Sequence, residues 1–316
     1  MQLSVFSTAL QELDWPGMLR WLQAHEVQYL ELGCGAFPGT RHSDAHLLLA
    51  DAKLRNTLLA DLAAHQITLA ALSCHGNPLH PNPAIAHAHD RDLAAAVELA
   101  HAMQVPVVVC FSGQSGDRPG ANQGDAHFST PNWPVVAWPD DFQTLRTWQW
   151  EERLIPYWKS MAHRAQQLGV QLALEMHGGF AVHNPATLLR LRDACGPALG
   201  ANLDPSHCWW QGMDPLVSVE LLGAALFHVH LKDTVFNPRA MAENGVLDAT
   251  PFAQSDWRAW RFAMPGEGHG VDFWRQLLRS LQGVNYKGVL SIEHEAPIAP
   301  LLGVPQTLRF MRDLAL

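Results

Sequence analysis

The sequence lacks several features that mark secreted, disulfide-rich or membrane-spanning proteins. Its five cysteines (Cys34, Cys74, Cys110, Cys195 and Cys208) are an odd, scattered set without a CxxC pair. This argues against a disulfide framework or a structural zinc site and favours a reducing compartment, so we expect a cytoplasmic protein. No apolar run reaches about 18 residues, which excludes a transmembrane helix of the usual kind. The first residues lack a basic region followed by a long apolar stretch, so no signal peptide is expected.

Positive charge is also scarce. The chain has only four lysines, and its 21 Lys and Arg residues against 30 Asp and Glu give a net charge of −9. A general nucleic-acid binder is more often basic, and an acidic surface repels anionic membranes, so we expect neither partner. By contrast, 18 histidines and 12 tryptophans are present. Histidine suits metal and proton chemistry and tryptophan suits flat apolar ligands, although both also serve core packing.

Eight short apolar runs recur along the 316 residues, at 2–7, 27–32, 67–74, 105–112, 170–177, 198–204, 226–232 and 287–295. Between them lie segments with the 3–4-residue apolar spacing of helices, at 45–66, 90–104, 152–168, 185–194 and 273–281. Asn184 followed by Pro185 is a helix-start signal, and Gly169 and Gly196 stand where helices are expected to stop.

This alternation predicts the fold class. Strands that alternate with helices form a parallel sheet, and eight such repeats close into an α/β (β/α)8 TIM barrel. We therefore predict one barrel domain over residues 1–316. An open doubly wound sheet is the alternative, but no GxGxxG motif follows the first strand.

Two stretches interrupt the repeat, at 113–149 after the fourth strand and at 234–270 after the seventh, and both are rich in Gly, Pro and Trp. Long loops that follow barrel strands open on the carboxyl-terminal face, where active sites lie. We expect these two to form walls of a substrate pocket. A contact between subunits of a homo-oligomer, such as a dimer, and an insertion without a functional role are the alternatives.

Metal-ligating side chains gather at the ends of the last four predicted strands. Because alternate strand residues share a face, the strands aim Glu175, Asp204, His230 and Glu293 toward one axis. Three carboxylates so placed would repel one another, and a divalent cation removes that cost. Mixed oxygen and nitrogen ligands suit Mn²⁺ or Mg²⁺, with Co²⁺, Fe²⁺ or Zn²⁺ as alternatives.

A resemblance to a known family is carried by four segments, LALEMH, NLDPSHCWW, HVHLKD and GVLSIEHE. Together they resemble the xylose-isomerase-like TIM barrel superfamily, which includes tagatose and psicose 3-epimerases, inosose dehydratases and AP-endonuclease-type barrels. The resemblance runs from the first strand to the last helix, and the NGVLD and GxGH segments resemble members described as sugar phosphate isomerases or epimerases. It implies that Glu175, Asp204, His230 and Glu293 hold the metal, that Glu175 and Glu293 act as acid and base, and that His207 contacts substrate.

Such a site suits a sugar or keto-sugar isomerase or epimerase. Interconversion through an enediol requires removal of a proton next to a carbonyl, and a divalent metal stabilises the developing enediolate as a Lewis acid. One carboxylate takes the proton and a second returns one. The partner expected is a small-molecule carbohydrate, and the further substrate-binding candidates, chosen by position, are His75, His177, Lys232, Trp210, Arg261 and His269.

Three other functions stay open. A lyase could use the same enolate to eliminate a β-leaving group from a keto-inositol or a 3-keto-glycoside. An AP-endonuclease-type nuclease needs a multi-metal cluster and a cationic DNA track, which four lysines and a charge of −9 disfavour. A non-enzymatic sugar-binding module is disfavoured because binding alone does not need two carboxylates beside an open metal.

Overall fold

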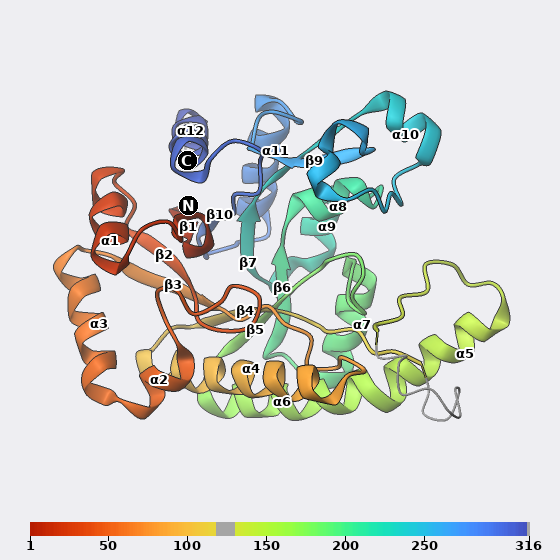
Figure 1. Ribbon diagram of the computed structural model, residues 1–316, viewed down its shortest axis with the longest axis horizontal. Coiled ribbons are helices and arrows are strands. Elements are labelled where there is room, and N and C mark those ends of the chain that lie inside the picture. Colours follow the sequence, from red (N-terminus) through yellow and green to blue (C-terminus); the bar gives the residue numbers. More distant parts are fainter. Residues whose placement is uncertain (118–129, 315–316) are drawn as a thin grey trace. The chain divides into compact units, whose positions relative to one another are not determined.

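The computed structural model describes residues 1–117 and 130–314 (Figure 1). Within them, parallel strands form a closed barrel in the order β1-β10-β7-β6-β5-β4-β3-β2. The strands are β1 (Leu3–Phe6), β2 (Tyr29–Gly33), β3 (Thr68–Ser73), β4 (Val107–Phe111), β5 (Gln171–Glu175), β6 (Leu199–Leu203), β7 (Leu226–Leu231) and β10 (Leu290–Ile292). Seven of the eight predicted runs contain one of these strands and the run 27–32 covers β2 except for its last residue, so the predicted TIM barrel is confirmed.

Contacts within the chain divide it into two compact units. Unit 1 comprises Met1–Glu31, Leu62–Ala70 and Leu203–Leu316, and unit 2 comprises Leu32–Asp61 and Ala71–Asn202. The prediction of a single domain stays a prediction. Among the described residues, no helix combines the length and the apolar character needed to cross a membrane.

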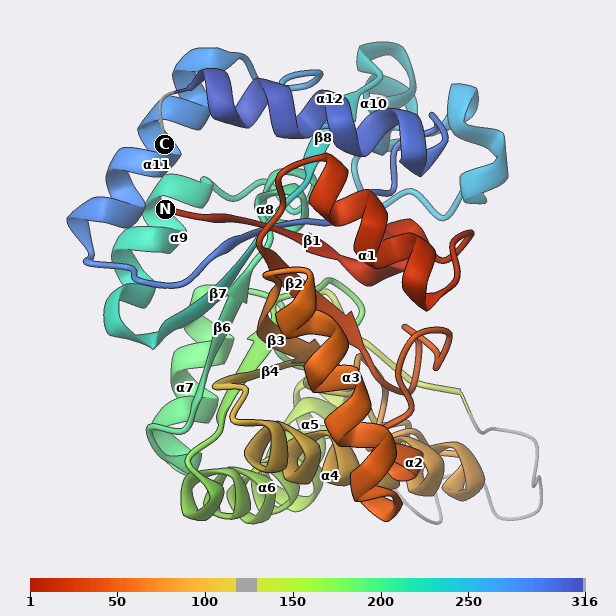
Figure 2. The ribbon, with the colours of Figure 1, turned by 90° about the vertical axis from the view of Figure 1, so that its left-hand side faces the viewer.

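Unit 1 is built on β1, which pairs in parallel with β10, which in turn pairs with β7. Its helices are α1 (Trp15–Ala24), α8 (Pro205–Trp210), α9 (Pro215–Leu222), α10 (Pro238–Asn244), α11 (Val271–Gly283) and α12 (Pro300–Asp313), several of which are seen in Figure 2. Helix α11 buries Trp274, Leu277 and Leu281 at 3–4-residue spacing. That apolar stripe packs the helix inward, in contact with α9.

Unit 2 is built on β3, β4 and β5, which pair in sequence order. Its helices are α2 (Ala45–Ala50), α4 (Pro83–Met103), α5 (Asp140–Trp148), α6 (Ile155–Leu168) and α7 (Pro185–Cys195), and α3 (Ala52–Ala64) runs from unit 2 into unit 1. Helices α4 and α6 lie side by side (Figure 1). The indole of Trp158 on α6 is fully buried and donates to the carbonyl of Ser112, just after β4.

The helix-boundary signals work as predicted in three places, the third being Gly196, which follows the last residue of α7, and they miss a break in a fourth. Asn184 caps α7 in a capping box with Thr187, and Gly169 ends α6 in the left-handed conformation. The predicted helix over 45–66 is instead two helices. The Asp51 carboxylate accepts hydrogen bonds from the backbone N–H groups of Lys53 and Leu54, and so starts α3 one residue after α2 ends.

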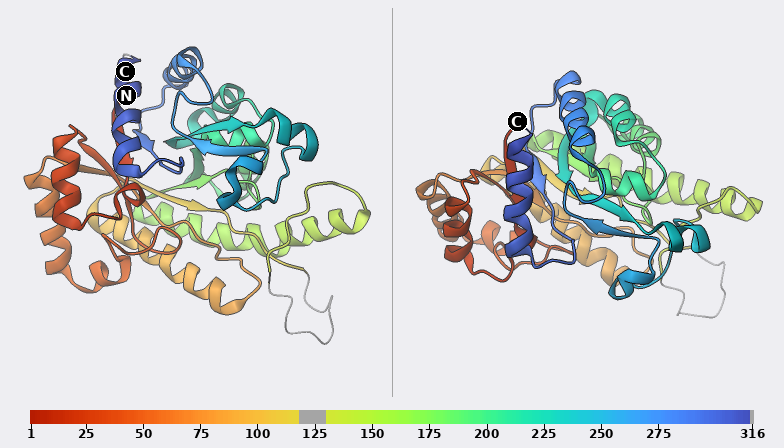
Figure 3. Two further views of the ribbon diagram at one scale, coloured as in Figure 1. Left: turned by 45° about the horizontal axis from the view of Figure 1, so that its top comes forward. Right: turned by 90° about the horizontal axis from the view of Figure 1, so that it is seen from above.

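The long connection expected after β7 is present and carries its own secondary structure. Strands β8 (Asp233–Phe236) and β9 (Trp260–Ala263) pair antiparallel, and α10 and the 3₁₀ helix Phe252–Trp257 lie between them (Figure 3, teal to blue). We call residues 233–270 the β8–β9 segment. The connection after β4 includes residues 118–129, which lie outside the described residues. Its later part leads into α5 and the π-helix Gln149–Leu154.

The two ends of the β8–β9 segment are tied together by Asp233, which is fully buried. One carboxylate oxygen, Oδ2, accepts the backbone N–H groups of Gly266, Gly268 and His269, at 3.0–3.1 Å. The other oxygen, Oδ1, lies 2.7 Å from His269 Nδ1. A carboxylate with this many donors fixes the loop that precedes α11.

Gly268 is required by this close approach. A Cβ there would lie 2.0 Å from the carbonyl oxygen of Thr234 and 2.8 Å from Asp233 Oδ1, so we expect Gly268→Ala to lower the free energy of unfolding by roughly 1–3 kcal/mol. The control is Gly283→Ala in α11, whose Cβ would meet nothing within 4 Å and which should be neutral or slightly stabilising. Urea unfolding of the two variants checks the prediction, and equal stability would contradict it.

Candidate metal centre

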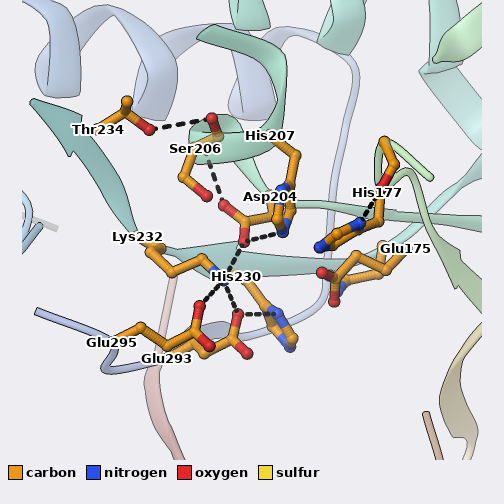
Figure 4. A network of polar contacts seen from close by, with 12 residues as sticks. Glu175, His177, Asp204, Ser206, His207, His230, Lys232, Thr234, Glu293 and Glu295 are labelled. Atoms are coloured by element: carbon orange, nitrogen blue, oxygen red, sulfur yellow. Dashed lines mark hydrogen bonds and ion pairs between the residues drawn. The ribbon is translucent and has the colours of Figure 1, made fainter. Parts of the chain in front are cut away.

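A buried group of acidic, imidazole and ammonium side chains occupies unit 1, and we call it the His230 cluster. Its members are Glu31, Asp204, His228, His230, Lys232 and Glu293. All except Glu293 are at most 2% exposed. Figure 4 shows the part of it around His230 and Lys232.

His230 lies between two carboxylates. Its Nε2 is 3.0 Å from Glu31 Oε1, and its Nδ1 is 3.1 Å from Glu293 Oε2. A carboxylate behind an imidazole fixes which ring nitrogen carries the proton and raises the basicity of the other one. With Nε2–H donated to Glu31, Nδ1 is the nitrogen that can accept a cation.

Glu31 is a member of the His230 cluster that the sequence pattern did not predict. It also receives His228 Nε2 at 2.9 Å. Strands β2 and β7 are separated by β1 and β10 in the barrel order, so these contacts require both side chains to point into the barrel. Burial alone would raise the pKa of Glu31, but the imidazoles of His230 and His228 hold it well below its usual range. A lone glutamate inside the apolar run YLELG was the available signal.

Lys232 is a buried cation held by carboxylates. Its Nζ lies 3.0 Å from Asp204 Oδ2, 2.7 Å from Glu293 Oε2 and 2.8 Å from Glu295 Oε2. The same ammonium lies 4.4 Å from the ring centroid of Phe262 on β9, so the β8–β9 segment reaches the cluster. These contacts offset part of the repulsion among the acidic side chains.

Asp204 and His207 are positioned by the start of α8. Asp204 is the N-cap, and its Oδ1 accepts the N–H of Ser206, which leaves Oδ2 facing Lys232. The Trp210 indole N–H donates to His207 Nδ1. Neutral His207 therefore carries its proton on Nε2, which lies 3.5 Å from Asp204 Oδ2.

The donor set fits a divalent cation. One ligand atom from each of Asp204, His230 and Glu293 lies within 4.8 Å of the others, and buried carboxylate oxygens with an imidazole are ligands for Mn²⁺, Mg²⁺, Co²⁺, Fe²⁺ or Zn²⁺. Glu31, His228 and His230 form a second set within the same spacing. In that set both imidazoles already bond to the Glu31 carboxylate, so it serves as hydrogen-bond support for His230.

In unit 2, Glu175 ends β5 and is 2% exposed. Its Oε2 lies 3.0 Å from His75 Nε2 and accepts the Asn202 side-chain amide at 3.1 Å. Two of the predicted residues are thus brought together here. The predicted His177 bonds through Nδ1 to the carbonyl of Gly178 and packs edge-on against Phe111.

The other predicted substrate-binding residues have protein neighbours in unit 1. Trp210 is buried and stacks on Trp260, with ring centroids 4.8 Å apart. His269 stacks on Trp209 at 3.7 Å and bonds to Asp233. Arg261 lies on β9 beside Glu267. Their contact with substrate, like the assigned roles of His75, His177, His207 and Lys232, stays a prediction.

Comparison with known proteins identifies the family. Residues 19–314 match the xylose isomerase-like TIM barrel family, so the chain belongs to it. The uncharacterized protein YfiH of Bacillus subtilis (strain 168) is 32% identical over 99% of each chain, and the inosose dehydratase of Geobacillus kaustophilus (strain HTA426) is 28% identical over 48% of each. The probable 3-DHS dehydratase AsbF from Bacillus anthracis shares the fold, with a TM-score of 0.67 at 16% identity over 99% of each chain. Sugar epimerases are also among the structural neighbours.

The buried Lys232 gives a prediction for the metal-free protein. Lys232→Met leaves Asp204, Glu293 and Glu295 without their shared cation, so we expect a loss of roughly 3 kcal/mol in the free energy of unfolding. The control is Lys53→Met on the exposed surface of α3, which should change little. Urea unfolding in EDTA measures both variants. An unchanged midpoint for Lys232→Met would show that the ion pairs contribute nothing.

Proposed function

We propose that this protein is a divalent-metal-dependent isomerase or epimerase that removes a proton next to the carbonyl of a sugar or keto-sugar. The observation that carries the proposal is that buried Asp204 and His230 lie close to the partly exposed Glu293, with Glu31 orienting His230. Glu175 is proposed as the fourth ligand, because it ends β5, the neighbour of β6 in the barrel order, and because the chain belongs to this family. The metal is proposed to be Mn²⁺ or Mg²⁺.

The bound cation would supply Lewis-acid stabilisation of the negative charge that develops on a substrate oxygen. Glu293 is proposed as one of the two acid–base groups, since Lys232 lies 2.7 Å from Oε2 and favours the carboxylate form that accepts a proton. Glu175 is proposed as the second. His207 would donate Nε2–H to a substrate hydroxyl, because Trp210 already bonds to its Nδ1. His75, beside Glu175, would orient that carboxylate.

A lyase that uses the same proton abstraction is the second candidate. Elimination of water requires a proton donor for the departing hydroxyl, and the Lys232 ammonium lies among the residues of the His230 cluster. The inosose dehydratases among the relatives, and the 3-DHS dehydratase among the structural neighbours, support keeping this reaction in view.

We also propose a reducing, cytoplasmic compartment. All five cysteines are free thiols, and burial raises the pKa of Cys34 and of Cys208 to about 12. Thiols in that state are unreactive, as expected of packing residues.

Metal content tests the ligand assignment. Asp204→Ala should lose the bound metal, because it removes a ligand oxygen from the cluster. Asp214→Ala is a matched control: Asp214 also precedes a proline, caps α9 and accepts a backbone N–H at 2.8 Å, as Asp204 does for α8. Elemental analysis after equilibration with Mn²⁺ compares the two. Equal metal content in both variants would sink the assignment.

Proton exchange tests the reaction. In D₂O, NMR of ketoses, inososes and 3-keto-glycosides with the metal-loaded protein should show deuterium at the carbon next to the carbonyl. Glu175→Gln and Glu293→Gln should each slow exchange by roughly 10²–10⁴-fold, the usual contribution of a general base. Glu98→Gln, on the exposed surface of α4, serves as the control. Retained exchange in both active-site variants would rule out the two-carboxylate mechanism, and loss of water from the substrate would identify a lyase.

A further inference from the structure

A cavity lies on the β8–β9 segment of unit 1. It has a volume of about 400 Å³, within the range of roughly 300–1,000 Å³ that is typical of small-molecule sites. Its lining residues are Val235, Phe236, Asn237, Arg258, Trp260, Arg261 and Pro297. The proposed acid–base chemistry makes no use of this space.

The lining is cationic. Among the described residues that form it are two arginines and no acidic residue, in a chain whose net charge is −9. Local positive charge on an acidic protein favours an anionic ligand at that point.

Arg258 is a rigidly held guanidinium. It is 3% exposed and lies over the rings of Phe252 and Trp260, 4.1 and 4.7 Å from their centroids. Its Nε donates to the carbonyl of Trp260, and its Nη1 donates to that of Thr250. Because a guanidinium has five N–H donors, these two carbonyls accept only some of the hydrogen bonds that Arg258 can donate.

Arg261 is the more accessible arginine. Its Nη1 lies 3.2 Å from the carbonyl of Phe262 and 3.3 Å from Glu267 Oε2, and the side chains of Arg261 and Glu267 are each about one-third exposed. An exposed ion pair of this kind contributes little. Arg261 can therefore exchange Glu267 for an incoming carboxylate or phosphate, which guanidinium binds in bidentate fashion.

Strand β9 contributes to both the His230 cluster and the cavity. Phe262 contacts Lys232, and the adjacent residue Arg261 lines the cavity. Because consecutive residues of a strand point to opposite faces, Arg261 points away from the face on which Phe262 meets Lys232. The cavity is therefore a binding site separate from the His230 cluster.

We propose that this cavity binds a small molecule through an oxyanion, either a carboxylate or a phosphate ester. The ligand class is then a small acidic metabolite, for which acidic sugars are suitable probes. This inference goes beyond the proposed function, and binding in the cavity can be measured without turnover.

The experiment is calorimetric titration of the metal-free protein with D-glucose 6-phosphate, D-glucuronate and D-glucose. One of the two acidic probes should bind about tenfold more tightly than glucose, as charge-assisted hydrogen bonds predict, and the better one identifies the oxyanion. Arg261→Gln should abolish this preference, and Arg261→Lys should restore part of it. Arg239→Gln is the matched control, since Arg239 lies on α10 of the same segment, is highly exposed and is not part of the lining.

Equal affinity for the three probes, or an equal loss in Arg261→Gln and Arg239→Gln, would overturn the proposed oxyanion site. Asp204→Ala should keep the preference for the acidic probe, because Asp204 does not line the cavity. If the cavity prefers the acidic probes but no substrate exchanges a proton, the oxyanion site is supported and the proposed function is wrong. If a substrate exchanges a proton but the cavity shows no preference for the acidic probes, the proposed function is supported and the oxyanion site is wrong.

Discussion

The structure depends on how negative charge is compensated inside a barrel. Glu31 and Asp204 are almost fully buried, and an isolated carboxylate in such a place is costly. The imidazoles of His228 and His230 bond to the Glu31 carboxylate. The Lys232 ammonium forms ion pairs with Asp204 and with the two glutamates after β10. Glu31 and the two imidazoles lie on β2 and β7, and Lys232 and Glu293 directly follow β7 and β10. The order in which β1, β10 and β7 pair in unit 1 therefore brings the acidic and basic side chains together.

The segment after β7 places apolar and cationic groups beside this charged cluster. Phe262 lies against Lys232 and, at 5.3 Å between ring centroids, against His207. Aromatic rings at that position exclude water and so strengthen the ion pairs that they cover. The segment therefore serves both the cluster and the arginine-lined cavity, which explains why β9 alternates apolar rings with Arg261.

The sequence predicted the barrel because its strands are short apolar runs, such as Val107–Phe111. Both faces of such a strand are largely buried, so nearly every residue in the run is apolar. It also predicted that Asp204, His230 and Glu293 point toward one axis. The face of a strand on which a side chain lies follows from the alternation of residues along that strand, without knowledge of the packing. Glu31 could not be found this way: it meets His228 across 197 positions of sequence. Arg258 was missed for a related reason, because its burial against Phe252 and Trp260 exists only in the folded segment.

Asp233 gives the β8–β9 segment a closed base. Its carboxylate joins the first residue of β8 to the loop before α11, so the chain leaves and re-enters the barrel at nearly one point. The entropy of closing a loop rises only slowly with its length. The part of the segment between Asp233 and Gly266 can therefore be made longer, made shorter or replaced with little loss of barrel stability. Such changes would adapt the same barrel to ligands of different size.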